Sequence, residues 1–193
     1  MKQLELTPRL MTAAQLVPCG TAMADIGTDH AYLPVWLLKQ LRDMGVKMLN
    51  ITMGNPYFNP HVNRPFAVGG YQAEEHPLVG VARMLKGTAL LKKEVPEIKI
   101  LCSALSYLGV AAPNVVAGFI ENGDFDLAGF GRQIFAYPDF AKDIMTQGAL
   151  DKKKICICCS KCTEIMRAGG TPGCVVRDRD PYFEIHKNVC GGK

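Results

Sequence analysis

The chain has 193 residues, 48% of them hydrophobic, which is the composition of a globular protein and excludes a disordered or fibrous one. Its formal net charge of +4 is modest, and no run of lysine or arginine forms a basic stripe, so nucleic acid is not expected as a partner. No apolar stretch approaches the ~20 residues that span a membrane, and residues 1–20 do not read as a signal peptide, so we expect a cytoplasmic protein with reduced cysteines.

The N-terminal part predicts a helix, a strand and a second helix. Residues 4–16 carry apolar side chains at helical spacing, and residues 22–27 form a predicted buried strand that ends at Gly27. An acidic residue and a glycine at the end of a first strand let the backbone approach a ligand and present the amides of the next helix to it. Asp25 and Gly27 occupy these positions, although two residues alone are equally compatible with a structural turn.

The segment Ala24-Asp-Ile-Gly-Thr-Asp-His-Ala-Tyr-Leu-Pro34 resembles the first motif of the bacterial tRNA adenine N1-methyltransferases. The resemblance covers residues 3–36 and implies a short Rossmann-like fragment of a fold that binds S-adenosylmethionine. The acidic residue that would hold the ribose after a second strand is missing.

Strands and helices alternate along the next part of the chain. Apolar periodicity and flanking glycine or proline predict strands over 46–53, 98–103 and 125–131, and helices over 37–44, 78–93, 113–122 and 138–147. Residues 54–65 form a polar, proline-rich loop. The alternation predicts an α/β protein with a parallel sheet, whose ligands lie at the carboxyl ends of the strands.

Five of the chain's eight cysteines lie within residues 155–174. Taking Cys156, Cys159 and Cys162 as ligands gives the spacing C-x2-C-x2-C, with Cys174 as a remote fourth thiolate and Cys158 as a spare thiol. This spacing favours a [4Fe-4S] cluster, which takes one cysteine per iron. A zinc ion bound by four cysteines, a disulfide pair and a metal-free loop remain the alternatives.

Two strand ends carry small residues beside an arginine. Ser103 and Ala104 close one predicted strand, and Gly131 and Arg132 close the next, so their backbone amides and the guanidinium could cradle a phosphate. Tight turns with a surface arginine explain the same residues. In the proline-rich loop, the side chains of His61, Asn63 and Arg64 are candidates to face a substrate.

Three segments resemble the NADH:flavin oxidoreductases of the old yellow enzyme family, in its iron-sulfur branch with 2,4-dienoyl-CoA reductase. They are Asn50-Ile-Thr-Met-Gly-Asn-Pro-Tyr-Phe-Asn-Pro-His-Val-Asn-Arg-Pro65, Asp126-Leu-Ala-Gly-Phe-Gly-Arg-Gln-Ile-Phe-Ala-Tyr-Pro-Asp-Phe140, and the cysteine run with Gly173-Cys-Val-Val176.

The match spans residues 37–189 and implies the C-terminal half of a (β/α)8 (TIM) barrel. It implies FMN with its phosphate at Ser103, Ala104, Gly131 and Arg132, a [4Fe-4S] cluster on the four cysteines, NAD(P)H as electron donor and hydride transfer to an activated double bond. The first half of the barrel is absent, and with it the catalytic acid.

The expected organisation is therefore a methyltransferase-like fragment over 1–36, a half-barrel over 37–150 and an iron-sulfur segment over 151–193. The leading hypothesis is a truncated or fused flavin oxidoreductase with a small-molecule substrate, in which a second chain or a homodimer completes the half-barrel. The alternatives are a tRNA methyltransferase-like binder of S-adenosylmethionine and a non-enzymatic fragment stabilised by a metal.

Overall fold

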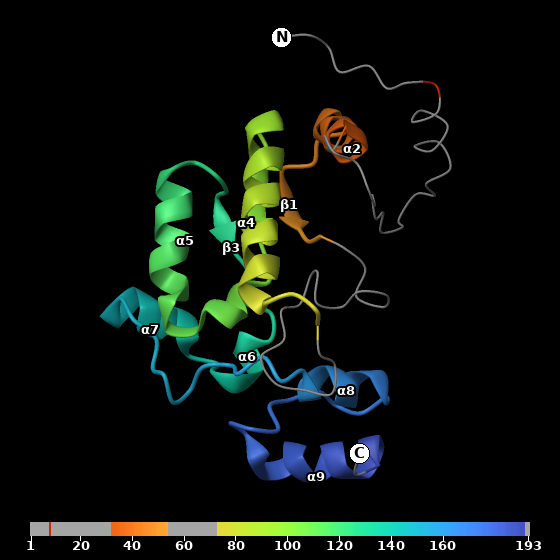
Figure 1. Cartoon of the computed structure of the whole chain (residues 1–193), viewed down its shortest axis with the longest axis vertical. Helices are drawn as coiled ribbons and strands as arrows, with labels where there is room; N and C mark the ends of the chain where they lie inside the picture. Colours follow the sequence, from red (N-terminus) through yellow and green to blue (C-terminus); the bar gives the residue numbers. More distant parts are fainter. Residues whose placement is uncertain (1–7, 9–31, 54–72, 192–193) are drawn as a thin grey trace.

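The computed structural model describes residues 8, 32–53 and 73–191 (Figure 1). The predicted helix over 4–16, apart from residue 8, and the predicted strand over 22–27 lie outside these ranges. None of the helices in the described ranges is both long and apolar enough to cross a membrane. In chain order the elements are α2 (Tyr32–Asp43), β1 (Met48–Ile51), α4 (Pro77–Glu94), β2 (Lys99–Cys102), the 3-10 helix η1 (Leu105–Ala111), α5 (Ala112–Glu121), β3 (Leu127–Ala128), α6 (Gln133–Ala136), α7 (Phe140–Gln147), α8 (Lys161–Arg167) and α9 (Arg179–Cys190).

The sheet has three parallel strands in the order β1-β2-β3. Ile51 pairs with Cys102, and Cys102 pairs with Ala128, so the three strands end side by side. Parallel neighbours need a crossover, and α4 and α5 supply the two crossovers. The predicted α/β protein with a parallel sheet is confirmed. In the described residues the sheet is open, and its three strands lend no support to the predicted (β/α)8 half-barrel.

The long helix α4 covers the sheet with apolar side chains. It begins with Pro77, whose fixed φ suits a first helical position, and the Nδ1 atom of His76 accepts a hydrogen bond from the Leu78 amide at 3.2 Å. Val81 and Leu85 belong to the same buried cluster as Ile100 and Cys102 of β2. Burial of these side chains supplies most of the driving force for docking the helix.

The helix α5 closes the other crossover and adds an aromatic pair to the core. Phe119 of α5 stacks on the buried Phe125 with ring centroids 5.7 Å apart. The turn into η1 requires Ala104 to adopt φ 67°, a left-handed conformation that costs a non-glycine residue energy. Since this turn carries no glycine or proline at that position, the sequence offered no signal for η1.

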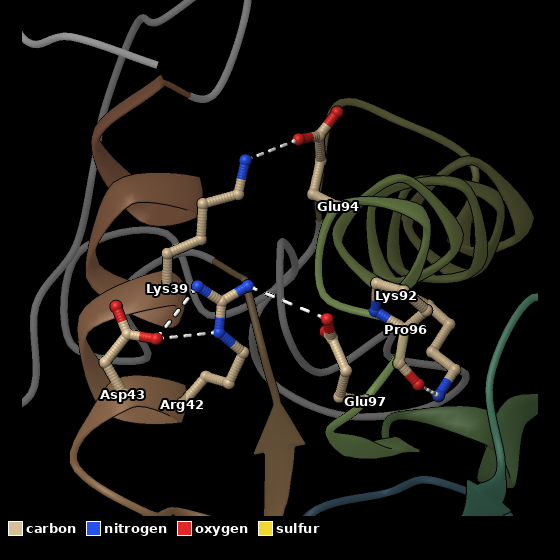
Figure 2. A network of polar contacts seen from close by, with 7 residues as sticks. All are labelled: Lys39, Arg42, Asp43, Lys92, Glu94, Pro96 and Glu97. Carbon is tan, nitrogen blue, oxygen red and sulfur yellow. Dashed lines mark hydrogen bonds and ion pairs between the residues drawn. The ribbon is translucent and has the colours of Figure 1, made fainter. Parts of the chain in front are cut away.

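The helix α2 is attached both by apolar side chains and by surface ion pairs. Val35 and Leu38 are buried in the same cluster as α4 and β2. Figure 2 shows Lys39 reaching toward Glu94, with Nζ and Oε2 3.1 Å apart, and Arg42 reaching toward Glu97. These pairs join α2 to the C-terminal end of α4 and to the loop beyond it.

The C-terminal part contains more helix than its sequence predicts. Residues 151–193 were expected only to carry cysteines, yet they include α8 and α9, which lie together at the C-terminal end of the molecule (Figure 1). Both helices are short and polar, and α8 buries Ile165 alone. Because both segments are mostly polar, their composition does not mark them as helices that pack on a core.

Candidate functional site

One pocket of the structure is lined by four cysteines. Cys156 and Cys159 come from the loop before α8, Cys162 from the first turn of α8, and Cys174 from the loop before α9. Cys158 is 1% exposed and does not line this pocket. The structure therefore gathers the four cysteines selected by spacing and separates them from the fifth. The remaining lining residues are Arg132, Phe135, Ile157, Ser160, Val175, Val176 and Arg177.

The loop that carries the first cysteines has an unusual backbone. Cys158 and Ser160 adopt φ values of 56° and 62°, in the left-handed region that non-glycine residues rarely occupy. Such conformations cost of order 1 kcal/mol each and concentrate at functional sites, where the surroundings hold them. The left-handed conformations at Cys158 and Ser160 turn the loop sharply, so that Cys156 and Cys159 line the same pocket.

Backbone amides donate hydrogen bonds to two of the sulfur atoms. The amide of Cys158 lies 3.3 Å from the Cys156 sulfur, and the amide of Arg177 lies 3.2 Å from the Cys174 sulfur. Amide donors stabilise the thiolate form of cysteine, which is the form that binds metal. All cysteines in the described ranges are free, so the disulfide alternative does not occur there.

The ionisation of the pocket thiols is uneven. A hydrogen bond with the Cys158 side chain, the Cys158 amide and the charges of Arg132 and Arg177 together outweigh burial and lower the pKa of Cys156 to about 6. Burial raises the pKa of Cys159 and of Cys162. The hydrogen bond with Cys156 and burial together raise the pKa of Cys158. Among Cys156, Cys159 and Cys162, it is Cys156 whose thiolate form the surroundings favour.

Side chains from elsewhere in the chain hold the pocket in place. Arg132 donates from Nη1 to the Ser160 hydroxyl at 2.9 Å, and Arg177 donates from Nε to the Ile155 carbonyl at 3.2 Å. Oε1 of the buried Gln133 accepts a hydrogen bond from the Cys156 amide at 3.0 Å, while Nε2 of Gln133 has no hydrogen-bond partner among the described residues. Sequence reasoning missed the roles of Gln133 and Arg177, because neither lies in a recognisable motif.

The predicted phosphate-binding residues are divided between two places. Ser103 lies at the end of β2 beside the end of β3, and its Oγ atom is 2.5 Å from Oδ1 of Asn50 in β1. A Cβ atom on Gly129 would lie 3.0 Å from the same hydroxyl, so the glycine lets these strand ends approach closely. Ala104 follows Ser103 into η1. Gly131 is exposed, and Arg132 lines the cysteine pocket.

The candidate substrate-facing residues His61, Asn63 and Arg64 lie outside the described residues, as do Asp25 and Gly27. Cys102 is fully buried in β2, and burial raises its pKa, as expected of a core thiol.

Comparison with known proteins defines the class of one part of the chain. Residues 6–55 match a family model described as a methyltransferase domain. The match includes α2 and β1, and it extends beyond the segment over 3–36 that the first motif suggests. The predicted resemblance of the N-terminal part to methyltransferases is confirmed.

A curated relative is similar over a longer part of the chain. The chain is 44% identical over 136 residues to a tRNA (adenine(22)-N(1))-methyltransferase of Bacillus subtilis (strain 168). The aligned part is 69% of this chain and 50% of the relative, so the chain spans about half the length of the curated relative it matches. No solved structure matches the chain.

These findings contradict several predictions. The matches are to methyltransferases, whose chemistry uses S-adenosylmethionine, so the predicted flavin oxidoreductase with FMN, a [4Fe-4S] cluster and NAD(P)H is wrong. The flavin oxidoreductase prediction relied on a resemblance over short segments with glycine-rich strand ends, and such strand ends recur in many unrelated α/β folds. The expectation that nucleic acid is not a partner is also contradicted, since the relative is by name a tRNA methyltransferase. A modest net charge does not exclude a local nucleic-acid surface.

Proposed function

We propose that the chain is an S-adenosylmethionine-dependent methyltransferase that modifies an adenine of tRNA. The observation that carries this proposal is the 44% identity over 136 residues with the Bacillus tRNA (adenine(22)-N(1))-methyltransferase. The methyltransferase-domain match over residues 6–55 supports it. In this reading the motif with Asp25 and Gly27 approaches the cofactor, as glycines at first strand ends do in dinucleotide-binding folds. A cytoplasmic location follows from a tRNA substrate.

The carboxyl edge of the sheet fits a nucleoside-like ligand. In open parallel sheets, ligands bind outside the carboxyl ends of the strands. Here the polar pair of Asn50 and Ser103 and the small residues Ala104 and Gly129 occupy that edge. The side-chain oxygen of Asn50 could accept a hydrogen bond from a ribose hydroxyl and so replace the carboxylate that is missing after the second strand. The polar side chains can form hydrogen bonds with the cofactor, and the small residues let the cofactor lie close to the protein backbone.

The chemistry demands positioning more than acid-base catalysis. S-adenosylmethionine supplies an activated methyl group, and N1 of adenine carries an in-plane lone pair that can accept it without prior loss of a proton. The protein's part is to hold the adenine edge in line with the methyl group and to exclude water, which is catalysis by orientation. Polar groups at the strand ends serve this purpose when their own positions are held by neighbours.

The test is methyl transfer from tritiated S-adenosylmethionine to tRNA that carries adenine at position 22, with tRNA that carries guanine there as the control. Methylation at N1 blocks the pairing edge, so reverse transcription should stop at this nucleotide. Asn50→Ala should weaken binding of S-adenosylhomocysteine by roughly tenfold, because one hydrogen bond between uncharged groups is lost and the ligand group is left without its partner. Asn122→Ala, at the exposed end of α5, should leave binding unchanged. Absence of both methyl transfer and ligand binding at millimolar concentration would overturn the proposal.

A second function is favoured by the cysteine pocket. We infer that Cys156, Cys159, Cys162 and Cys174 bind a thiophilic metal. Their common pocket, the amide hydrogen bonds to two sulfurs and the positive charges of Arg132 and Arg177 all suit thiolate ligands. The buried Gln133 holds the loop that carries the first ligand, because its Oε1 atom accepts a hydrogen bond from the Cys156 amide. Such a metal would tie together loops that have little apolar core of their own.

Metal analysis of protein purified without oxygen tests this second function. Wild-type protein should retain a thiophilic metal, and Cys159→Ser and Cys174→Ser should lose most of it, because each removes one ligand. Cys158→Ser is the matched control and should retain the metal, since Cys158 does not line the pocket. A metal-free wild-type protein in which all eight cysteines react with a thiol reagent after denaturation would contradict the assignment.

A further inference from the structure

A second group of metal-ligating side chains lies apart from the cysteine pocket. Glu164 of α8 and His186 and Cys190 of α9 bring a carboxylate oxygen, an imidazole nitrogen and a thiol sulfur within 4.8 Å of one another. Among the residues that the structure describes, no other group of three or more histidine, cysteine or acidic side chains has its ligand atoms this close together. None of the three lines the cysteine pocket.

The two helices place these side chains by simple geometry. His186 and Cys190 are four residues apart and therefore share one face of α9. Glu164 faces them from α8, which contacts α9 (Figure 1). Nε2 of His186 lies 2.7 Å from Oε2 of Glu164, and the His186 side chain is 13% exposed while that of Glu164 is 48% exposed. The site is thus enclosed on the histidine side and open to solvent on the glutamate side.

The donor set is chemically suited to zinc. Zinc binds imidazole nitrogen, thiolate sulfur and carboxylate oxygen at about 2.0–2.3 Å, usually with four ligands in a tetrahedron. Ligand atoms in such a site lie roughly 3.3–3.8 Å apart, so small rotations of the three side chains would reach it. A water molecule from the open side can complete the coordination. On binding, the Cys190 thiol releases its proton to solvent and the imidazole binds in its neutral form.

The packing of the helix pair gives such a metal a structural role. The helix α9, described over its whole length, has no buried residue, and α8 buries only Ile165. Gly170, between the helices, would place a Cβ atom 2.9 Å from Ile165 and 3.4 Å from Val189, so the contact is close but small. Small units with little core commonly depend on a metal or another cross-link. A shared ion between α8 and α9 would supply the missing attachment.

We propose that Glu164, His186 and Cys190 form a site for zinc or a similar divalent ion that clamps α9 onto α8. The site is independent of the cysteine pocket and of S-adenosylmethionine binding. Without the ion, the His186–Glu164 hydrogen bond and the small apolar contact at Gly170 join the two helices.

The test uses the full chain, stripped with chelator and reloaded with zinc under reducing conditions. Zinc per chain should be lower by about one equivalent in His186→Gln and in Cys190→Ser than in the wild type, because each removes a ligand of a single ion. Glu184→Gln is the matched control, since it removes a carboxylate from an exposed position of α9 and should keep the wild-type zinc content. In the wild type and in this control, zinc should slow amide hydrogen exchange over residues 179–190, and in the two ligand variants it should not.

The wild type and the three variants all keep the cysteine pocket. The difference in zinc content between them therefore reports only the ion bound by Glu164, His186 and Cys190. Protection of α4 against exchange reports whether each variant is folded, and the conservative His186→Gln change stands in if Cys190→Ser fails to fold. Equal zinc content in the wild type and in His186→Gln would overturn the proposal, and the three residues would then form only a hydrogen-bonded pair with a neighbouring thiol. Loss of zinc in Glu184→Gln as well would overturn it too, because binding would not depend on these ligands.

Discussion

At the scale of single residues, the acid Asp126 connects the sheet to the end of α4. Its carboxylate lies 2.8 Å from Nζ of Lys92 and 2.9 Å from Nζ of Lys99, and it accepts the Ile100 amide at 2.8 Å. Lys92 is 9% exposed and also donates to the carbonyls of Pro96 and Ile98. A buried ammonium with three acceptors is well compensated, whereas one that loses its carboxylate is not.

Replacing Asp126 by Asn should lower the free energy of unfolding by about 2 kcal/mol at neutral pH, because the buried Lys92 loses its counter-charge but keeps two carbonyl acceptors. Glu121→Gln, at an exposed position of α5, is the charge-matched control and should change stability by less than about 0.5 kcal/mol. Urea unfolding followed by circular dichroism measures both values. Equal stability of the two variants would show that Lys92 is solvated when Asp126 is neutral.

The same carboxylate makes a defined contribution to the pH dependence of stability. Burial opposes its ionisation, but hydrogen bonds from Lys92, the Ile100 amide and Lys99 outweigh burial and lower the pKa of Asp126 from 3.8 to about 2. The folded state therefore favours the charged form, and the stabilisation is present in full above the unfolded-state pKa. The difference in unfolding free energy between wild type and Asp126→Asn should accordingly shrink as the pH falls from about 4 toward 2. A constant difference over this range would contradict the assignment.

At the scale of elements, α2 combines two kinds of attachment whose energies differ. Leu38 is 7% exposed in the central cluster, while its neighbour Lys39 forms an ion pair with Glu94 across 3.1 Å at the surface (Figure 2). Exposed ion pairs contribute little because solvent screens them and both side chains lose freedom. Apolar burial should hold α2, and the ion pairs should set its orientation.

Leu38→Ala should therefore cost about 2–3 kcal/mol of unfolding free energy, because a buried side chain is lost and a cavity remains. Lys39→Ala, one residue along the same helix, should cost about 0.5 kcal/mol or less and lose even this effect in 1 M salt. Denaturant unfolding at low and high salt distinguishes the two contributions. If Lys39→Ala proved as costly as Leu38→Ala, the ion pair would be the main attachment.

At the scale of the whole molecule, buried surface is distributed unevenly along the chain. The helix α4 and the strand β2 contain Met84, Ile100 and Cys102, all with no exposure. By contrast, α7 and α9, both described in full, bury no residue. Local stability follows buried apolar contact, so the sheet with α4 and the C-terminal helices should differ in how readily they open.

Hydrogen exchange followed by mass spectrometry should show the slowest amides in α4 and β2 and faster exchange in α7 and α9, by at least tenfold. In metal-free protein the contrast should be largest, since nothing then supplements the small contact between α8 and α9. Uniform protection across all four elements would mean that the molecule opens only as one cooperative unit.

The alternation of apolar segments was enough to predict the parallel α/β sheet. Strands predicted over 46–53, 98–103 and 125–131 contain β1, β2 and β3, because a buried strand leaves an apolar run bounded by turn residues. The first motif also identified the methyltransferase relationship of the N-terminal part. Function across the remaining chain was misjudged, since a likeness over short loop segments carries no information about the chemistry of the whole site.

Sequence by itself determined the alternation of elements and the set of four cysteines, because both depend on spacing along the chain. Only the tertiary structure decided that Arg177 and Gln133 support the cysteine pocket, and that Cys190 lies beside Glu164 and His186. Cys190 had no assigned role in the sequence, since its partner Glu164 is far from it along the chain. Contacts between distant residues depend on how helices pack, and the sequence of one helix does not show which other helix it will contact.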